Sequence, residues 1–157
     1  MTEINGLRLA YRGFVAGLAA AYVWTAIAMV LAAVVHHDPL APLRPIATAV
    51  TPLAGTAELA FVLGLAVIQG TGALVGMCFA YFFARFFTIR ATLGISAPVV
   101  AVLAWTLMSV ILAGSGTAVE PMPQAVAVVA TVGFGLVLGA SVPVRHEVTR
   151  QSGSPST

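Results

Sequence analysis

The stretch that decides the fold is residues 57–90, which read AELAFVLGLAVIQGTGALVGMCFAYFFARFFTIR. Residues 59–84 carry no charged side chain, and this run is longer than the roughly 20 apolar residues that cross a bilayer as a helix. On a helix at about 100° per residue, two of its polar side chains and two of its glycines share one narrow sector: Glu58, Gln69, Gly72 and Gly76. In lipid, small and polar residues are found where helices meet one another. The stretch therefore predicts the central helix of a membrane bundle.

The composition of the whole chain agrees with this interpretation. Of the 157 residues, 60% are hydrophobic and only 8% are charged, and the mean hydropathy is +1.03. Soluble domains carry about 25% charged residues, so this chain has too few to cover a surface in water. The net charge of +2 comes from few ionisable groups, and we expect no nucleic-acid partner. We predict an all-α integral membrane protein whose first partner is the lipid bilayer.

Apolar segments predict four transmembrane helices, at residues 14–35, 57–84, 97–113 and 124–142. Together they form a transmembrane domain over residues 14–143, between an N-terminal segment of residues 1–13 and a polar tail of residues 144–157. The first segment is longer than the roughly 7–15 apolar residues of a signal peptide, so we expect it to be retained. The loop of residues 36–55 contains four prolines, which exclude a regular spanning helix. We expect this loop to lie along the outer surface, with a short helical turn near residues 46–50.

The arginines predict the orientation of the bundle. Six of them fall on one side of the predicted helices: Arg8, Arg12, Arg85, Arg90, Arg145 and Arg150. The other side receives only Arg44. The positive-inside rule then places both termini in the cytoplasm, in a multi-pass protein of the cell inner membrane.

Two sequence patterns recur in the two halves of the chain. Trp24-Thr25 in the first predicted helix matches Trp105-Thr106 in the third. The second and fourth helices each carry the spacing GxGxxxG, at residues 70–76 and 133–139. These matches predict a duplicated helical hairpin; the alternative is coincidence in a sequence rich in Gly, Ala and Val. The two tryptophans could pack against one another, or they could face lipid or a neighbouring subunit.

We interpret eight glycines as helix-packing residues: Gly13, Gly17, Gly70, Gly72, Gly76, Gly133, Gly135 and Gly139. Small residues in membrane helices let two backbones approach closely. The alternative, a dinucleotide site, requires GxGxxG between a strand and a helix, and both the spacing and the context differ here.

The remaining polar candidates lie at two places. His36, His37 and Asp38 form an outer-surface cluster that could bind a metal or a proton, but a polar helix end explains it better. Glu58 and Gln69 could line a polar path along the second helix, although no further acid, lysine or histidine follows them within that span. We therefore predict no metal site, no cofactor and no catalytic residues. We also expect no b-type haem, because all histidines fall at the ends of the predicted spans; the alternative requires axial ligands from methionines or from a partner.

The order of these features resembles small bacterial inner-membrane proteins of the YagU-like type. The similarity rests on a glycine-bearing first helix, a long first loop, a Gly-xxx-Gly second helix, the WTLMSV sequence of residues 105–110 and a glycine-rich fourth helix. It covers most of residues 10–143. The resemblance implies a four-helix membrane fold, and it carries over no functional residue.

For function, we expect a non-catalytic subunit or accessory protein of a larger membrane assembly, such as a respiratory complex. Such a protein is not an enzyme, and its partners would be larger membrane proteins or further copies of itself. The alternative is a small transporter or channel that uses Glu58 and Gln69. A membrane enzyme or quinone-binding module at residues 36–38 ranks last.

Overall fold

The computed structural model describes residues 3–51, 56–82, 90–114 and 124–142, and these residues form helices and turns without a strand. Five helices follow one another in the described part of the chain: α1 (Glu3–His36), α2 (Arg44–Val50), α3 (Ala57–Phe82), α4 (Arg90–Gly114) and α5 (Gln124–Ser141). The predicted all-α class is confirmed, and α2 extends the short helical turn that we expected in the first loop.

Two helices begin earlier than the sequence indicated. α1 begins at Glu3, so residues 3–13 continue the first apolar helix instead of forming a separate segment. α4 begins at Arg90 and includes residues 90–96, which we expected to be a connection. Charged residues mark the end of an apolar run, but Arg is also a good helix former. The hydropathy of the sequence therefore located the apolar parts of α1 and α4 and missed the polar residues with which these two helices begin.

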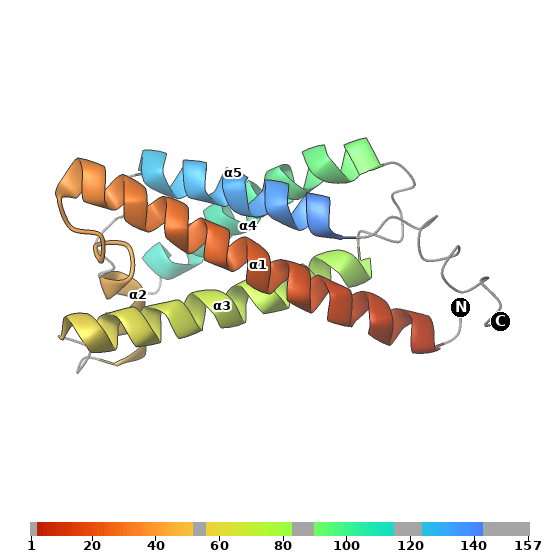
Figure 1. Cartoon of the computed structure of the whole chain (residues 1–157), viewed down its shortest axis with the longest axis horizontal. Coiled ribbons are helices and arrows are strands. Elements are labelled where there is room, and N and C mark those ends of the chain that lie inside the picture. The colour runs from red at the N-terminus through yellow and green to blue at the C-terminus, as the bar shows by residue number, and fades with distance from the viewer. Residues whose placement is uncertain (1–2, 52–55, 83–89, 115–123, 143–157) are drawn as a thin grey trace, which may run out of the picture.

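The long helices α1, α3, α4 and α5 run alternately in opposite directions along one axis (Figure 1). α1 packs against α3 and α5, α4 packs against α5, and the short α2 packs against α3. The first turn of α1 and the last turn of α5 lie at the same end of the bundle (Figure 1). α2 lies at the opposite end, beside the beginning of α3.

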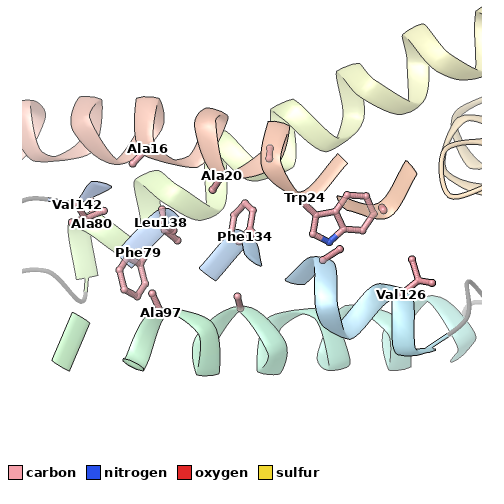
Figure 2. Close-up of a cluster of buried hydrophobic side chains, with 14 residues drawn as sticks. Ala16, Ala20, Trp24, Phe79, Ala80, Ala97, Val126, Phe134, Leu138 and Val142 are labelled. Carbon is pink, nitrogen blue, oxygen red and sulfur yellow. The ribbon is translucent and has the colours of Figure 1, made fainter. Parts of the chain in front are cut away.

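The core between these helices consists mostly of small side chains. Its buried alanines come from all four long helices: Ala16, Ala20, Ala21, Ala28, Ala80, Ala97, Ala101 and Ala130. A few large side chains fill the remaining space, and Figure 2 shows Phe79 of α3 beside Ala97 of α4. Phe134 of α5 lies beneath Ala20 of α1 in the same view. Small residues at the contacts allow the helix axes to approach closely, as they do in membrane bundles.

Two helices are long and apolar enough to cross a membrane. These are α1, from Gly6 to His36, and α3, from Ala57 to Phe82. At about 1.5 Å per residue, the 26 residues of α3 extend about 39 Å, against about 30 Å for the hydrocarbon core of a bilayer. The described apolar segments of α4 and α5, Gly94–Leu107 and Ala125–Ser141, are shorter.

Candidate functional site

α1 and α3 cross at small residues, with backbone against backbone. Each helix contributes two glycines and an alanine at four-residue spacing: Gly13, Gly17 and Ala21 of α1, and Gly72, Gly76 and Ala80 of α3. A methyl group at Gly76 would lie 2.6 Å from the Cα atom of Gly17, and one at Gly72 would lie 2.5 Å from Cβ of Ala21. Carbon atoms do not approach one another so closely, so only glycine fits at these positions without a shift of the helices.

The other predicted packing glycines have different surroundings. A methyl group at Gly135 would lie 2.6 Å from the backbone nitrogen of Pro98, so α5 contacts the α4 backbone there. Gly133 faces the flexible end of the Ile27 side chain, and Gly139 is buried. Gly70 is exposed, and a methyl group there would meet nothing within 4 Å. Gly70 is therefore not a packing residue within this chain.

A packing glycine that the sequence reasoning missed lies under α2. A methyl group at Gly64 would lie 2.9 Å from the carbonyl oxygen of Leu43, at the start of α2. Leu43 is fully buried, and Ala47 and Ala60 continue the contact between the two helices. The spacing of Ala60 and Gly64, four residues apart, was the available signal.

The two tryptophans meet inside the bundle. Their ring centroids lie 5.9 Å apart with an interplanar angle of 42°, and Trp24 is only 6% exposed. The Trp24 indole Nε1–H also donates a hydrogen bond to Oγ1 of Thr131 at 3.3 Å. Of the alternatives left open for these residues, contact between Trp24 and Trp105 is confirmed. The contacts of Trp24 join α1 to α4 and to α5.

The neighbouring threonines satisfy their hydroxyl donors locally. Thr25 Oγ1–H donates to the carbonyl of Ala21 at 2.9 Å, and Thr106 Oγ1–H donates to that of Val102 at 2.8 Å. Such bonds to the carbonyl four residues earlier are common for threonine within helices. Thr25 is buried, whereas Thr106 is exposed.

The predicted polar path along α3 has an exposed end and a buried end. Glu58 is exposed in the first turn of the helix, where its charge suits the helix dipole. Both polar atoms of the Gln69 side chain are buried without a hydrogen-bond partner among the described residues. On the face that joins them lie Val62 and Leu65, which are apolar. The described residues therefore do not form a continuous polar path between Glu58 and Gln69.

The outer polar cluster forms the turn between α1 and α2. Asp38 Oδ2 lies 2.7 Å from Nη1 of Arg44, and Asp38 Oδ1 accepts the backbone N–H of Leu40 at 3.0 Å. His36 and His37 are exposed. Among the described residues, no three His, Cys, Asp or Glu side chains are grouped so that they could hold a metal ion. Asp38 thus links the turn after α1 to the first residue of α2 through a partly exposed ion pair.

The backbone of this turn gives a stability prediction. His37 follows the last residue of α1 and has a φ of 56°, in the left-handed region where glycine is favoured after a helix. We expect His37→Gly to stabilise the fold by about 1 kcal/mol, since a side chain is strained in this conformation. Unfolding in a mixture of mild detergent and dodecyl sulfate measures the difference. His36→Gly is the matched control, and it should destabilise because His36 is helical; a loss of stability in both variants would contradict the prediction.

These observations define the class of the protein as an all-α bundle, with two helices long and apolar enough to cross a membrane. Comparison with protein-family models, curated proteins and solved structures found no match. The resemblance to YagU-like proteins therefore stays a prediction.

Proposed function

We propose that the protein is a four-helix integral membrane protein of a bacterial inner membrane, crossed by α1, α3, α4 and α5. The support comes from its surface, where large apolar side chains are exposed on every long helix. Val34 of α1, Val62 of α3, Leu107 of α4 and Val129 of α5 are each more than half exposed. Extended apolar surface of this kind is rare on soluble monomers, and it suits contact with lipid chains.

The proposed orientation places both termini in the cytoplasm. Arg8 and Arg12 are exposed near the beginning of α1, and the backbone of α4 begins at Arg90. At the far end of α1, Arg44 is the one arginine among the described residues, and it forms an ion pair with Asp38. Such an asymmetry in the number of arginines favours the cytoplasm for the end that holds Arg8, Arg12 and Arg90.

A topology map tests the membrane proposal. We expect reporters fused before Glu3 and after the last residue to be cytoplasmic, and a reporter inserted after Thr51 to be periplasmic. Fusions to a periplasmic phosphatase and to a cytoplasmic fluorescent protein give opposite signals and check one another. Termini on opposite sides of the membrane, or an odd number of crossings, would contradict the proposal.

We also propose that the bundle arose from a duplicated hairpin, because equivalent positions make equivalent contacts. Matching Trp24 to Trp105 and residues 70–76 to 133–139 makes Gly17 equivalent to Pro98, and Gly72 equivalent to Gly135. Gly72 lies against Gly17 in the first hairpin, and Gly135 lies against Pro98 in the second. Coincidence in glycine-rich sequence would not be expected to repeat a three-dimensional contact.

For the cellular role, we propose a non-catalytic subunit of a larger membrane assembly, such as a respiratory complex. The observation that carries this proposal is the outward face of α3. Gly70 and Ala66, four residues apart, are both exposed there, and nothing lies within 4 Å of the Gly70 methyl position. A spacing of small residues gives little contact with lipid chains, but it allows a second helix to approach closely. α3 thus presents small residues both to α1 and to the outside.

Purification from native membranes tests this role. We expect the protein to be recovered in mild detergent in a fixed ratio with larger membrane proteins. Gly70→Leu should release those partners, because a large side chain blocks close approach, whereas Val129→Leu on α5, at an exposed position that already carries a large side chain, should retain them. Recovery of the wild type only as a free monomer or homo-oligomer would count against the proposal.

A further inference from the structure

The beginning of α1 has an exposed face that carries two arginines and a tyrosine. Arg8, Arg12 and Val15 are four and three residues apart, so they share one side of the helix. All three are exposed, and Tyr11 beside them is 67% exposed. Gly13, which packs against the backbone of α3, lies on another side of α1. The face with the arginines is therefore open to molecules outside the bundle.

The length of α1 places both arginines at the depth of the lipid headgroups. Residues 13–35 carry no charge, and at about 1.5 Å per residue they extend about 35 Å, against about 30 Å for the hydrocarbon core of a bilayer. In the membrane insertion proposed above, Arg12 then lies at the edge of the hydrocarbon and Arg8 about 6 Å further out. The headgroup layer on each side is about 5–7 Å thick. The first turns of α1 also project beyond the last turns of α3 and α5 at this end of the bundle (Figure 1). Both guanidinium groups therefore meet headgroups.

The chemistry of the two side chains selects a phosphate group on a lipid that carries no cation of its own. Each guanidinium group can bind a phosphate with two parallel N–H groups, which the ammonium group of a lysine cannot do. Two cations one helical turn apart repel the ammonium group of a zwitterionic lipid and attract a lipid with a net negative charge. Because α1 runs across the membrane, the arginines lie at two depths, whereas the phosphates of one leaflet lie at one depth. The two side chains can therefore converge on a single phosphate from above and below.

We propose that Arg8 and Arg12 together bind the phosphate of one anionic phospholipid in the cytoplasmic leaflet. This binding requires the membrane insertion proposed above, and it adds a lipid ligand to it. The Tyr11 ring lies beside the headgroup at the membrane interface, where tyrosine is common, and Val15, about one turn deeper, contacts the acyl chain. Among the side chains that the structure describes, none forms an ion pair with Arg8, so its charge is available to the lipid.

Native mass spectrometry of the full chain measures this binding. The protein is purified from carbonate-washed membranes in mild detergent and titrated with phosphatidylglycerol, and in parallel with zwitterionic phosphatidylethanolamine. We expect phosphatidylglycerol to bind about tenfold more tightly or better, and we expect Arg8→Gln and Arg12→Gln each to weaken its binding by about fivefold. Arg44→Gln is the matched control, because this arginine lies at the far end of α1 and its Nη1 is 2.7 Å from Oδ2 of Asp38; it should leave the binding unchanged.

Four results would overturn the proposal. Equal affinities for the two lipids would do so, and so would equal losses of affinity in Arg8→Gln and Arg44→Gln. Binding of cardiolipin, which carries two phosphates, about tenfold more tightly than phosphatidylglycerol would show that the arginines do not share a single phosphate. A protein that remains in the carbonate-washed membrane but shows no preference for phosphatidylglycerol would overturn the lipid site alone. Release of the protein by carbonate would overturn the membrane insertion together with the lipid site.

Discussion

Replacing Gly76 with leucine is expected to force α1 and α3 apart and to produce the largest loss of stability of any single change at the crossing. A methyl group at this position already lies 2.6 Å from Cα of Gly17, and the neighbouring atoms belong to backbone. Backbone cannot move aside as the end of a flexible side chain can. Overpacking costs about 1–3 kcal/mol and occasionally more, and we expect Gly76→Ala within this range and Gly76→Leu above it. Unfolding from mild detergent into dodecyl sulfate, followed by tryptophan fluorescence and circular dichroism, gives both values.

Gly70 provides the control on the same helix. A methyl group at Gly70 would meet nothing within 4 Å, and alanine favours a helix over glycine by about 1 kcal/mol. Gly70→Ala is therefore expected to leave the stability unchanged or to raise it. If Gly70→Ala and Gly76→Ala lowered the stability equally, the loss would not come from the contact with α1, and the crossing described above would be wrong.

These two glycines also show how far the sequence could predict the packing. Gly70 and Gly72 are separated by about 200° around a helix, so they cannot both face one neighbour. The small and polar sector around Gly72 and Gly76 indicated one contact face, and α1 occupies it. The pattern GxGxxxG did not reveal that Gly70 is left outside this contact. That distinction depends on the position of α1, which a spacing within α3 does not encode.

The bounds of the helices, like their packing, could be predicted from the sequence only in part. The charge-free run of residues 59–84 located α3, since an apolar helix needs no tertiary information to be recognised. The beginnings of α1 and α4 were missed because charged residues there interrupt the apolar pattern without ending the helix. Gln69 and Glu58 share a face in sequence, yet only the structure shows that the amide is buried while the carboxylate is exposed.

Truncating Trp24 to alanine is the second change for which we expect a large effect. The indole is 6% exposed, contacts Trp105 and donates to Thr131, so its removal leaves a cavity between α1, α4 and α5. Replacement of a buried aromatic residue by alanine costs about 3–5 kcal/mol in well-packed proteins. Trp24→Phe keeps most of the ring and loses the hydrogen bond, and bonds between membrane helices average about 0.6 kcal/mol. Unfolding of both variants in dodecyl sulfate separates the contribution of the buried ring from that of the hydrogen bond. It is followed by circular dichroism, because both variants lose a fluorescent tryptophan.

Tyr22→Ala is the matched control for Trp24→Ala. Tyr22 lies on the same helix but is 59% exposed, so its truncation leaves no cavity. In lipid, moving an apolar side chain from a helix contact to the outside costs little, and helices are held together mainly by packing. Trp24→Ala should therefore lower the free energy of unfolding by about 2 kcal/mol or more beyond the effect of Tyr22→Ala, because only Trp24→Ala leaves a cavity. Equal costs would show that the contact of Trp24 with Trp105 and Thr131 does not hold the bundle together.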